Sequence, residues 1–255
     1  MNPLDAGLVL AAGCAAGLIN AVVGSGTLIT FPALLAMGYP PVVANASNAV
    51  GLSWGGAASL PGFRRELAGQ GRLLLRLGLA SATGGLVGGI LLLTLSAQVF
   101  DAVVPGLILL GCALVALQPW LARRVRAVGA GMGGDRPTWR GPAAPAVTFL
   151  TGIYGGYFGA AQGVLLMGAL GLLLRQDPYR LNAIKNAMAM AANLASGLLF
   201  MVVADIAWPV AVLIGVGSMA GGLLGARVGR RIPPTALRVL ILVVGVVSVV
   251  RFLAG

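Results

Sequence analysis

The chain has no histidine and few charged residues of either sign. Only 9% of its 255 residues are charged, and the six acids are Asp5, Glu66, Asp101, Asp135, Asp177 and Asp205. Each acid lies at or near the end of an apolar run, so no carboxylate or imidazole is available inside one. General acid–base catalysis and transition-metal binding normally depend on such groups. The sequence therefore predicts no enzyme activity, no metal site and no cofactor.

Cysteine is also scarce, with only Cys14 and Cys112 in the chain. Both lie inside apolar runs, where a free thiol usually behaves as a small packing residue. We therefore expect neither a disulfide nor a metal-binding pair.

Apolar residues, by contrast, are in excess. They make up 58% of the chain, whereas a soluble domain averages roughly 45–50% apolar and about 25% charged residues. This composition predicts an all-α, polytopic integral membrane protein, because too little polar surface remains to cover a globule in water. The net charge of +11 comes from arginines between or at the ends of apolar runs and one lysine. That pattern is typical of cytoplasmic membrane loops, so we expect a lipid bilayer rather than nucleic acid as the partner.

Ten apolar runs divide the chain, at about 4–23, 26–38, 43–61, 73–95, 99–121, 144–163, 164–174, 183–204, 207–226 and 235–253. A membrane-spanning helix needs about 20 residues, and eight of the runs reach or approach that length. The runs 26–38 and 164–174 are too short. Each follows a long run across a break of small residues, at 24–27 and at 159–163. We predict a broken or re-entrant helix pair at each break.

The two halves of the sequence resemble each other at a constant shift of 137 residues. This shift pairs Pro41 with Pro178 and Asn45 with Asn182, and it aligns two copies of the motif Ser-x-x-Gly-Gly-Leu-x-Gly. Each half holds five apolar segments, and two halves with an odd number of crossings must have opposite orientations. Inverted repeats with broken helices are typical of secondary transporters. The alternative is a duplicated bundle without a transport role.

The predicted domains follow from this repeat. We expect a first transmembrane repeat at 1–121, a cytoplasmic linker at 122–142 and a second transmembrane repeat at 143–255. The apolar segments run from 4–23 to residue 121 in the first repeat and over 144–253 in the second. Each repeat is a broken helix pair followed by three spanning helices.

Charge predicts the orientation in the membrane. Arginines concentrate in 62–76, 122–142 and 227–238, which we therefore place in the cytoplasm. The short turns near Asp101 and Asp205 then face outward. Both chain termini are expected on the outer side.

The two breaks are the first candidate site. Irregular backbone at membrane depth is tolerated where it is buried in protein or lines a cavity. A short helix that starts at a break has free N–H groups, which favour an anion, and Ser25, Thr27 and Gln162 add side-chain donors. Close helix packing is the alternative role for Gly24 and Gly26.

Polar residues near the start of two later helices form the second candidate site. Asn45 and Asn182 act there either as helix N-caps or as ligands. Lys185, the only lysine, either extends to the cytoplasmic interface or points into the cavity and neutralises an anion. No interior carboxylate is available for a cation, so the electrostatics favour an anionic substrate. The candidate substrate-binding residues are Gly24, Ser25, Gly26, Thr27, Asn45, Ser47, Asn48, Gln162, Gly163, Asn182, Lys185 and Asn186.

Several of these segments resemble the sulfite exporter TauE/SafE family. They are Gly-Ser-Gly-Thr-Leu-Ile-Thr-Phe-Pro at 24–32, Ala-Asn-Ala-Ser-Asn at 44–48, Gly-Phe-Arg-Arg-Glu-Leu at 62–67 and Arg-Leu-Asn-Ala-Ile-Lys-Asn at 180–186. The resemblance implies a multi-pass transporter of the bacterial inner membrane that moves sulfite, organosulfonates or related small anions. Family members often have three consecutive glycines where Ser25 stands here, and the second half reads Ala-Ala-Gln-Gly at 160–163.

We therefore expect a secondary transporter that works by alternating access, with one half rocking or sliding against the other around a small anion. A cation or metal permease and a non-transporting membrane scaffold are the alternatives. The direction of transport, the coupling ion and the oligomeric state, including a homodimer, stay open.

Overall fold

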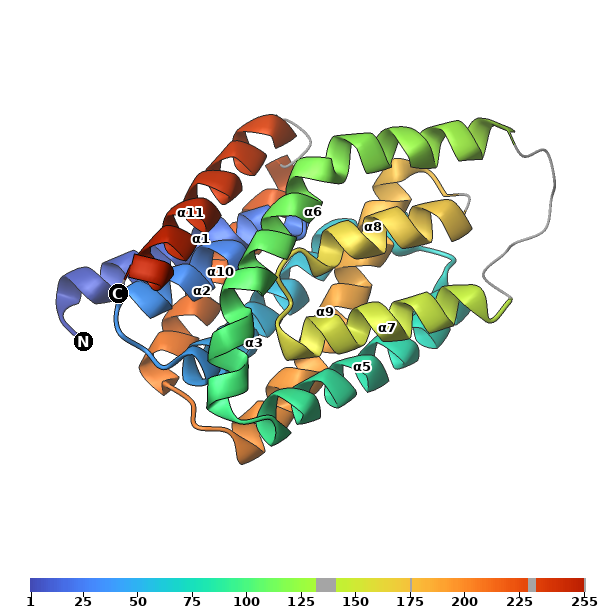
Figure 1. Ribbon diagram of the computed structural model, residues 1–255. Helices are drawn as coiled ribbons and strands as arrows, with labels where there is room; N and C mark the ends of the chain where they lie inside the picture. The colour runs from blue at the N-terminus through green and yellow to red at the C-terminus, as the bar shows by residue number, and fades with distance from the viewer. Residues whose placement is uncertain (132–140, 175, 229–232, 255) are drawn as a thin grey trace.

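The computed structural model describes residues 1–131, 141–174, 176–228 and 233–254, and no strand occurs among them (Figure 1). The all-α prediction is therefore confirmed. The elements are α1 (Pro3–Val22), α2 (Thr27–Ala36), α3 (Pro41–Ser59), η1 (Leu60–Phe63), α4 (Arg64–Leu67), α5 (Gly71–Thr94), α6 (Ala97–Gly131), α7 (Ala143–Tyr157), α8 (Gln162–Leu173), α9 (Pro178–Val203), α10 (Trp208–Val228) and α11 (Pro234–Ala254).

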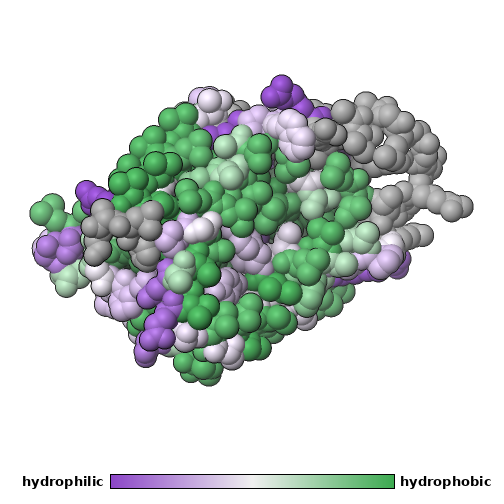
Figure 2. All heavy atoms as spheres, in the orientation of Figure 1, coloured by the Kyte–Doolittle hydropathy of each residue, from purple (hydrophilic) through white to green (hydrophobic). Residues whose placement is uncertain are grey.

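The molecule is a multi-pass membrane protein. In the part of the chain that the structure describes, five helices are long and apolar enough to span a membrane, namely α1, α5, α6, α9 and α10. Their outward faces carry large apolar side chains such as Leu79 and Val202, which are 60% and 84% exposed. Hydrophobic residues accordingly cover much of the face seen in Figure 2. Such a surface is stable against lipid rather than water.

Both predicted short helices are present, and both follow a sharp turn. Gly24, with φ +91°, lies in the segment between α1 and α2, and Gly159, with φ +75°, lies in the segment between α7 and α8. Glycine adopts this left-handed conformation without a steric penalty. The second turn also places Ala161 at φ 60°, a conformation uncommon for a residue with a side chain. α7 is shorter than the run 144–163 suggested, because the break begins directly after Tyr157.

The two breaks touch each other in the interior of the protein. Gly163 N donates a hydrogen bond to Gly24 O at 3.1 Å. A Cβ atom on either glycine would lie 2.6 Å from the Cα atom of the other. Only two glycines permit this backbone-to-backbone contact, which joins the first half of the chain to the second.

The long helices of each half of the chain pack mainly against helices of the other half. α1 packs along α10 and α3 also packs on α10, while α5 packs between α7 and α9. The neighbouring positions of α5 and α7 are visible in Figure 1. Small residues allow these helices to approach closely. For example, a Cβ atom on Gly152 of α7 would meet the carbonyl oxygen of Ser81 on α5 at 2.6 Å.

α6 is the longest helix and extends beyond the first predicted repeat. It continues from residue 122 to Gly131, inside the stretch that we predicted as a linker, whereas 132–140 lie outside the described residues. Two prolines, Pro105 and Pro119, lie inside this helix, and Figure 1 shows that it bends along its length. Proline removes a backbone donor and clashes with the preceding turn, which accounts for a bend.

Candidate functional site

The carboxyl end of α1 is held by three polar side chains from α9. Asn182 Nδ2 and Asn186 Nδ2 both donate to Ala21 O, at 3.2 and 3.1 Å. Lys185 Nζ donates to Asn20 O at 3.1 Å. The last carbonyl groups of a helix lack partners within the helix and carry partial negative charge. The α9 side chains satisfy them and place an ammonium group beside the first break.

These contacts decide two of the alternatives that the sequence left open. Lys185 is completely buried, so it does not extend to the membrane surface. Asn182 and Asn45 are not N-caps, because the capping residues of their helices are Asp177 and Pro40. All three side chains instead reach toward neighbouring helices.

Asn45 and Asn48 make the corresponding contacts on α3. Asn45 Nδ2 donates to Tyr157 O, at the end of α7, at 2.8 Å. Asn48 Nδ2 donates to Thr27 Oγ1 at 3.4 Å, and Asn48 Oδ1 accepts a hydrogen bond from Thr30 Oγ1. Asn48 therefore ties α3 to the first turns of α2.

Two further side chains cap backbone at the breaks and loops. Asn20 Oδ1 accepts a hydrogen bond from Gly26 N at 2.7 Å, at the start of α2. Ser47 Oγ accepts one from Ala207 N at 2.9 Å, just before α10. Ser47 thus stabilises a loop of the other half.

The prediction of free N–H groups at the starts of both short helices is largely wrong. Gly26 N is bonded to Asn20, and Gly163 N is bonded to Gly24 O. The contact between the breaks and the Asn20 side chain satisfy these groups, neither of which the local sequence pattern indicates. Other donors at the breaks belong to side chains.

Ser25 and Gln162 supply two of these donors, one from each break. Both residues are almost fully buried, with 0% and 2% of their surface exposed. Ser25 Oγ and Gln162 Nε2 have no hydrogen-bond partner among the described residues. A buried polar group without a partner costs about 1–3 kcal/mol. Both groups are therefore available to a further hydrogen-bond partner.

Two small cavities lie at and near the breaks, and Gln162 lines the one where the breaks meet. The central cavity, where the breaks meet, offers about 10 Å³ to the centre of a water-sized molecule, and the second offers about 20 Å³. One water needs roughly 10–15 Å³ by this measure, so a larger solute requires the site to widen. Both cavities are lined by Asn20, Asn186, Ala189 and Asn193, which makes them neighbours.

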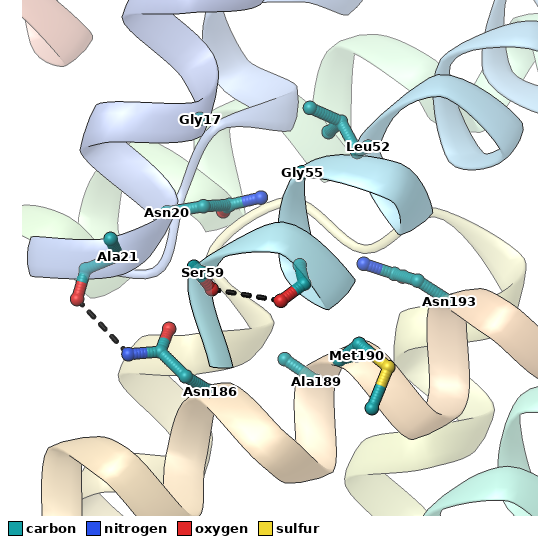
Figure 3. Close-up of a pocket in the computed structure, with 11 residues that line it drawn as sticks. Gly17, Asn20, Ala21, Leu52, Gly55, Ser59, Asn186, Ala189, Met190 and Asn193 are labelled. Carbon is teal, nitrogen blue, oxygen red and sulfur yellow. Dashed lines mark hydrogen bonds between the residues drawn. The ribbon is translucent and has the colours of Figure 1, made fainter. Parts of the chain in front are cut away.

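The second cavity lies between α1, α3 and α9 (Figure 3). The amide groups of Asn20 and Asn193 point into the space between the three helices. Ser59 lines it near the end of α3, directly before the arginine-rich segment 62–76. Leu52 and Met190 give the same cavity an apolar part.

An aromatic cluster, formed by Phe31, Phe100, Tyr157 and Phe158, packs where α2, α6 and the end of α7 meet. Phe31 and Phe158 pack edge to face with ring centroids 5.2 Å apart. Phe100 lies 5.6 Å from Tyr157 and 6.3 Å from Phe158. The three phenylalanines are buried. The cluster fills the interior near the start of α6.

A comparison with protein families matches the profile described as "Sulfite exporter TauE/SafE" over residues 9–252. The chain belongs to the TauE/SafE family. The resemblance inferred from its motifs is therefore confirmed, and the protein is a membrane transporter rather than an enzyme.

Relatives of this TauE/SafE protein carry the same general description. A probable membrane transporter protein, ORF9, from Sinorhizobium sp is 27% identical over 94% of this chain and 88% of its own length. A probable membrane transporter protein from Haemophilus influenzae is 29% identical over 92% of this chain and 87% of its own. Probable membrane transporter protein YfcA of Escherichia coli is 25% identical over 99% of this chain and 91% of its own length. No solved structure matches the chain.

Half of the candidate residues line the central cavity of this TauE/SafE protein. The remaining ones, apart from Ser25, hold helices and loops together around it. The residues selected from the sequence include neither Asn20 nor Asn193, although both line the two cavities. Asn20 is an isolated amide near the end of an apolar run, four residues before the break, and this position was the available signal. The lining candidates are Gly24, Thr27, Gln162, Gly163, Lys185 and Asn186.

Proposed function

We propose that this protein moves sulfite, an organosulfonate or a related small sulfur-containing anion across the bacterial inner membrane. The observation that carries the proposal is the buried amino group of Lys185, which lines the central cavity together with the unpartnered donor of Gln162, while Ser25 offers a second unpartnered donor in the first break. Lys185 makes its hydrogen bond to a neutral carbonyl group and forms no ion pair within the described residues. A buried charge without a counterion is costly. A small oxyanion at the breaks would neutralise it and accept hydrogen bonds from the other two side chains.

Two inverted repeats would supply the scaffold for this transport. The shift of 137 residues relates α1 to α7, α3 to α9 and α5 to α10. The packing of α1 on α10 then corresponds to that of α7 on α5, and α3 on α10 corresponds to α9 on α5. This exchange of partners supports two halves related by a pseudo-two-fold axis, with the contact between Gly24 and Gly163 near that axis. Substrate sites of inverted-repeat transporters lie at such an interface.

The surroundings of the site suit alternating access. On one side, the central cavity adjoins the second cavity, which extends to Ser59, shortly before the arginine-rich segment that the sequence predicts in the cytoplasm. On the other side, the aromatic cluster fills the space near the turn placed outside. We infer that this conformation is sealed outward by the aromatic cluster. Outward opening would separate the rings as one half rocks against the other.

The second cavity also suits a sulfonate with a short organic group. The charged end would lie at the breaks, and the organic group would extend toward Leu52 and Met190. Apolar contact there would favour such a substrate over an inorganic anion of the same charge.

A matched pair of variants in proteoliposomes tests the proposal. Lys185→Met keeps the length of the side chain and removes its charge, so sulfite and sulfonate flux should fall at least about tenfold. Asn182→Ala is the control, because Asn182 holds the same end of α1 but lies outside both cavities. It should keep most of the flux. Full flux in folded Lys185→Met, or an equal loss in both variants, would contradict the assigned site.

A further inference from the structure

A separate, wider cavity lies between the start of α5 and the start of α9. It offers about 610 Å³ to the centre of a water-sized molecule and shares no lining residue with the two cavities at the breaks. Residues 69–73 form one wall, and Gln176 and Arg180 form the other. Neither the transport site nor the packing of the halves uses this space.

The walls of this cavity carry an excess of donors. Arg72 and Arg180 both line it, and the guanidinium groups have no hydrogen bond or ion pair to any residue that the structure describes. The first backbone bond in this turn of α5 runs from Leu74 N to Gln70 O, at 2.9 Å. The N–H groups of residues 71–73 therefore have no partner within the helix, and these residues line the same cavity. Two positive charges and a helix start favour an anion.

Gln70 provides an independent indication of a ligand. It lines the cavity and is only 8% exposed. Its Nε2 donates to Glu66 O at 2.7 Å, whereas its Oε1 has no partner among the described residues. An amide oxygen accepts hydrogen bonds. A ligand that satisfies the whole cavity therefore combines an anionic group with a nearby hydroxyl or ammonium donor.

The corresponding place in the second half differs in each of these respects. The shift of 137 residues relates Gln70, Arg72 and Arg180 to Ala207, Pro209 and Val43. There, Ala207 N is bonded to a serine side chain, and the proline has no N–H group to offer. The basic cavity is therefore not a general consequence of the repeated helix arrangement.

The lipid-facing surface of the protein begins beside this cavity. Leu75 and Leu79 follow Arg72 on the same face of α5 and are 66% and 60% exposed. The segment 62–76 is arginine-rich and placed at the cytoplasmic surface, where anionic lipids concentrate. We propose that the cavity binds the headgroup of an anionic phospholipid with free hydroxyl groups, such as phosphatidylglycerol. Arg72, Arg180 and the start of α5 hold the phosphate, Gln70 accepts a hydroxyl hydrogen, and the acyl chains follow Leu75 and Leu79.

Native mass spectrometry of the purified protein, titrated with phosphatidylglycerol, tests this site. The double variant Arg72→Gln/Arg180→Gln should bind phosphatidylglycerol at least about tenfold more weakly, because two charge-assisted contacts are lost. The control Arg64→Gln/Arg65→Gln removes the same charge from the same surface but leaves the cavity intact. It should bind as the unmodified protein does. Equal loss in both double variants would overturn the proposal, because binding would then depend on net charge alone.

Two further measurements separate a lipid from a free anion. Millimolar inorganic phosphate should not displace phosphatidylglycerol, and displacement would overturn the lipid assignment in favour of a soluble anion. Gln70→Leu should remove the preference for phosphatidylglycerol over phosphatidic acid, which lacks the glycerol hydroxyls. An unchanged preference would contradict the role of Gln70. These measurements do not depend on transport, so they can succeed or fail independently of the proposed substrate.

Discussion

The contact between the two breaks can be tested by adding one methyl group. A Cβ atom on Gly163 would lie 2.6 Å from Gly24 Cα, whereas carbon atoms in favourable contact are about 3.5–4.0 Å apart. Gly163→Ala therefore requires the two backbones to separate by about 1 Å. Overpacking of this kind usually costs about 1–3 kcal/mol. Gly24→Ala meets the same clash and also places a side chain at φ +91°, which adds roughly 1–2 kcal/mol.

Gly38→Ala is a matched control for the strain alone. Gly38 has φ +82°, similar to Gly24, but nothing lies within 4 Å of the position where its Cβ atom would be. We expect this variant to lose only roughly 1–2 kcal/mol of stability, because of the strain of the left-handed conformation. Gly24→Ala should lose about 2–5 kcal/mol in total, the sum of strain and overpacking.

Reversible unfolding in mixed detergent micelles measures these differences, and anion flux measures their effect on transport. Flux should fall in Gly24→Ala and Gly163→Ala, because separated breaks displace the donors of Ser25 and Gln162. Gly38→Ala should transport normally. If Gly24→Ala destabilises the protein no more than Gly38→Ala, the breaks do not meet, and the assigned central site is wrong.

Two other predictions concern the seal and the unpartnered donors. Phe158→Ala removes two edge-to-face contacts of the aromatic cluster. In a protein that lacks the native cysteines and carries Thr27→Cys, this variant should speed the labelling of the new cysteine by an impermeant thiol reagent added outside. An unchanged labelling rate would argue against a seal. Ser25→Ala removes a buried donor that has no partner. Substrate-free protein should therefore be at least as stable as the wild type while its sulfite flux falls, and a loss of stability without a loss of flux would contradict the assigned role.

Much of the fold followed from the sequence because membrane helices leave a strong local signal. Continuous apolar runs, the two short runs and their glycine-containing breaks predicted the helices in order, including α2 and α8. The ends of the helices were less predictable. α6 continues to Gly131, past the point at which its apolar run ends, because backbone hydrogen bonds extend a helix regardless of whether its surface meets lipid.

The candidate site was predicted as a set of residue types, and only the structure shows which hydrogen-bond partner each side chain has. Ser47 and Asn45 bond to Ala207 and Tyr157, which are more than a hundred positions away in the chain. Such distant partners leave no trace in local spacing. The same limit explains Gly163, whose N–H group was expected to be free but is bonded to the opposite break.

Related positions of the two halves carry different side chains, and this difference favours one substrate site over two in the proposed transporter. The shift relates Lys185 to Asn48, so only one half places an ammonium at its break. It also relates Phe31 and Phe158, one from each half, to Gly168 and Ala21, so these two rings have no aromatic counterpart at the related positions. In the proposed inverted-repeat scaffold, the breaks meet and the helices of the two halves exchange partners. Under the proposed function, the single charge would define where an anion is stabilised, and the rings would define which side is closed while it is held there.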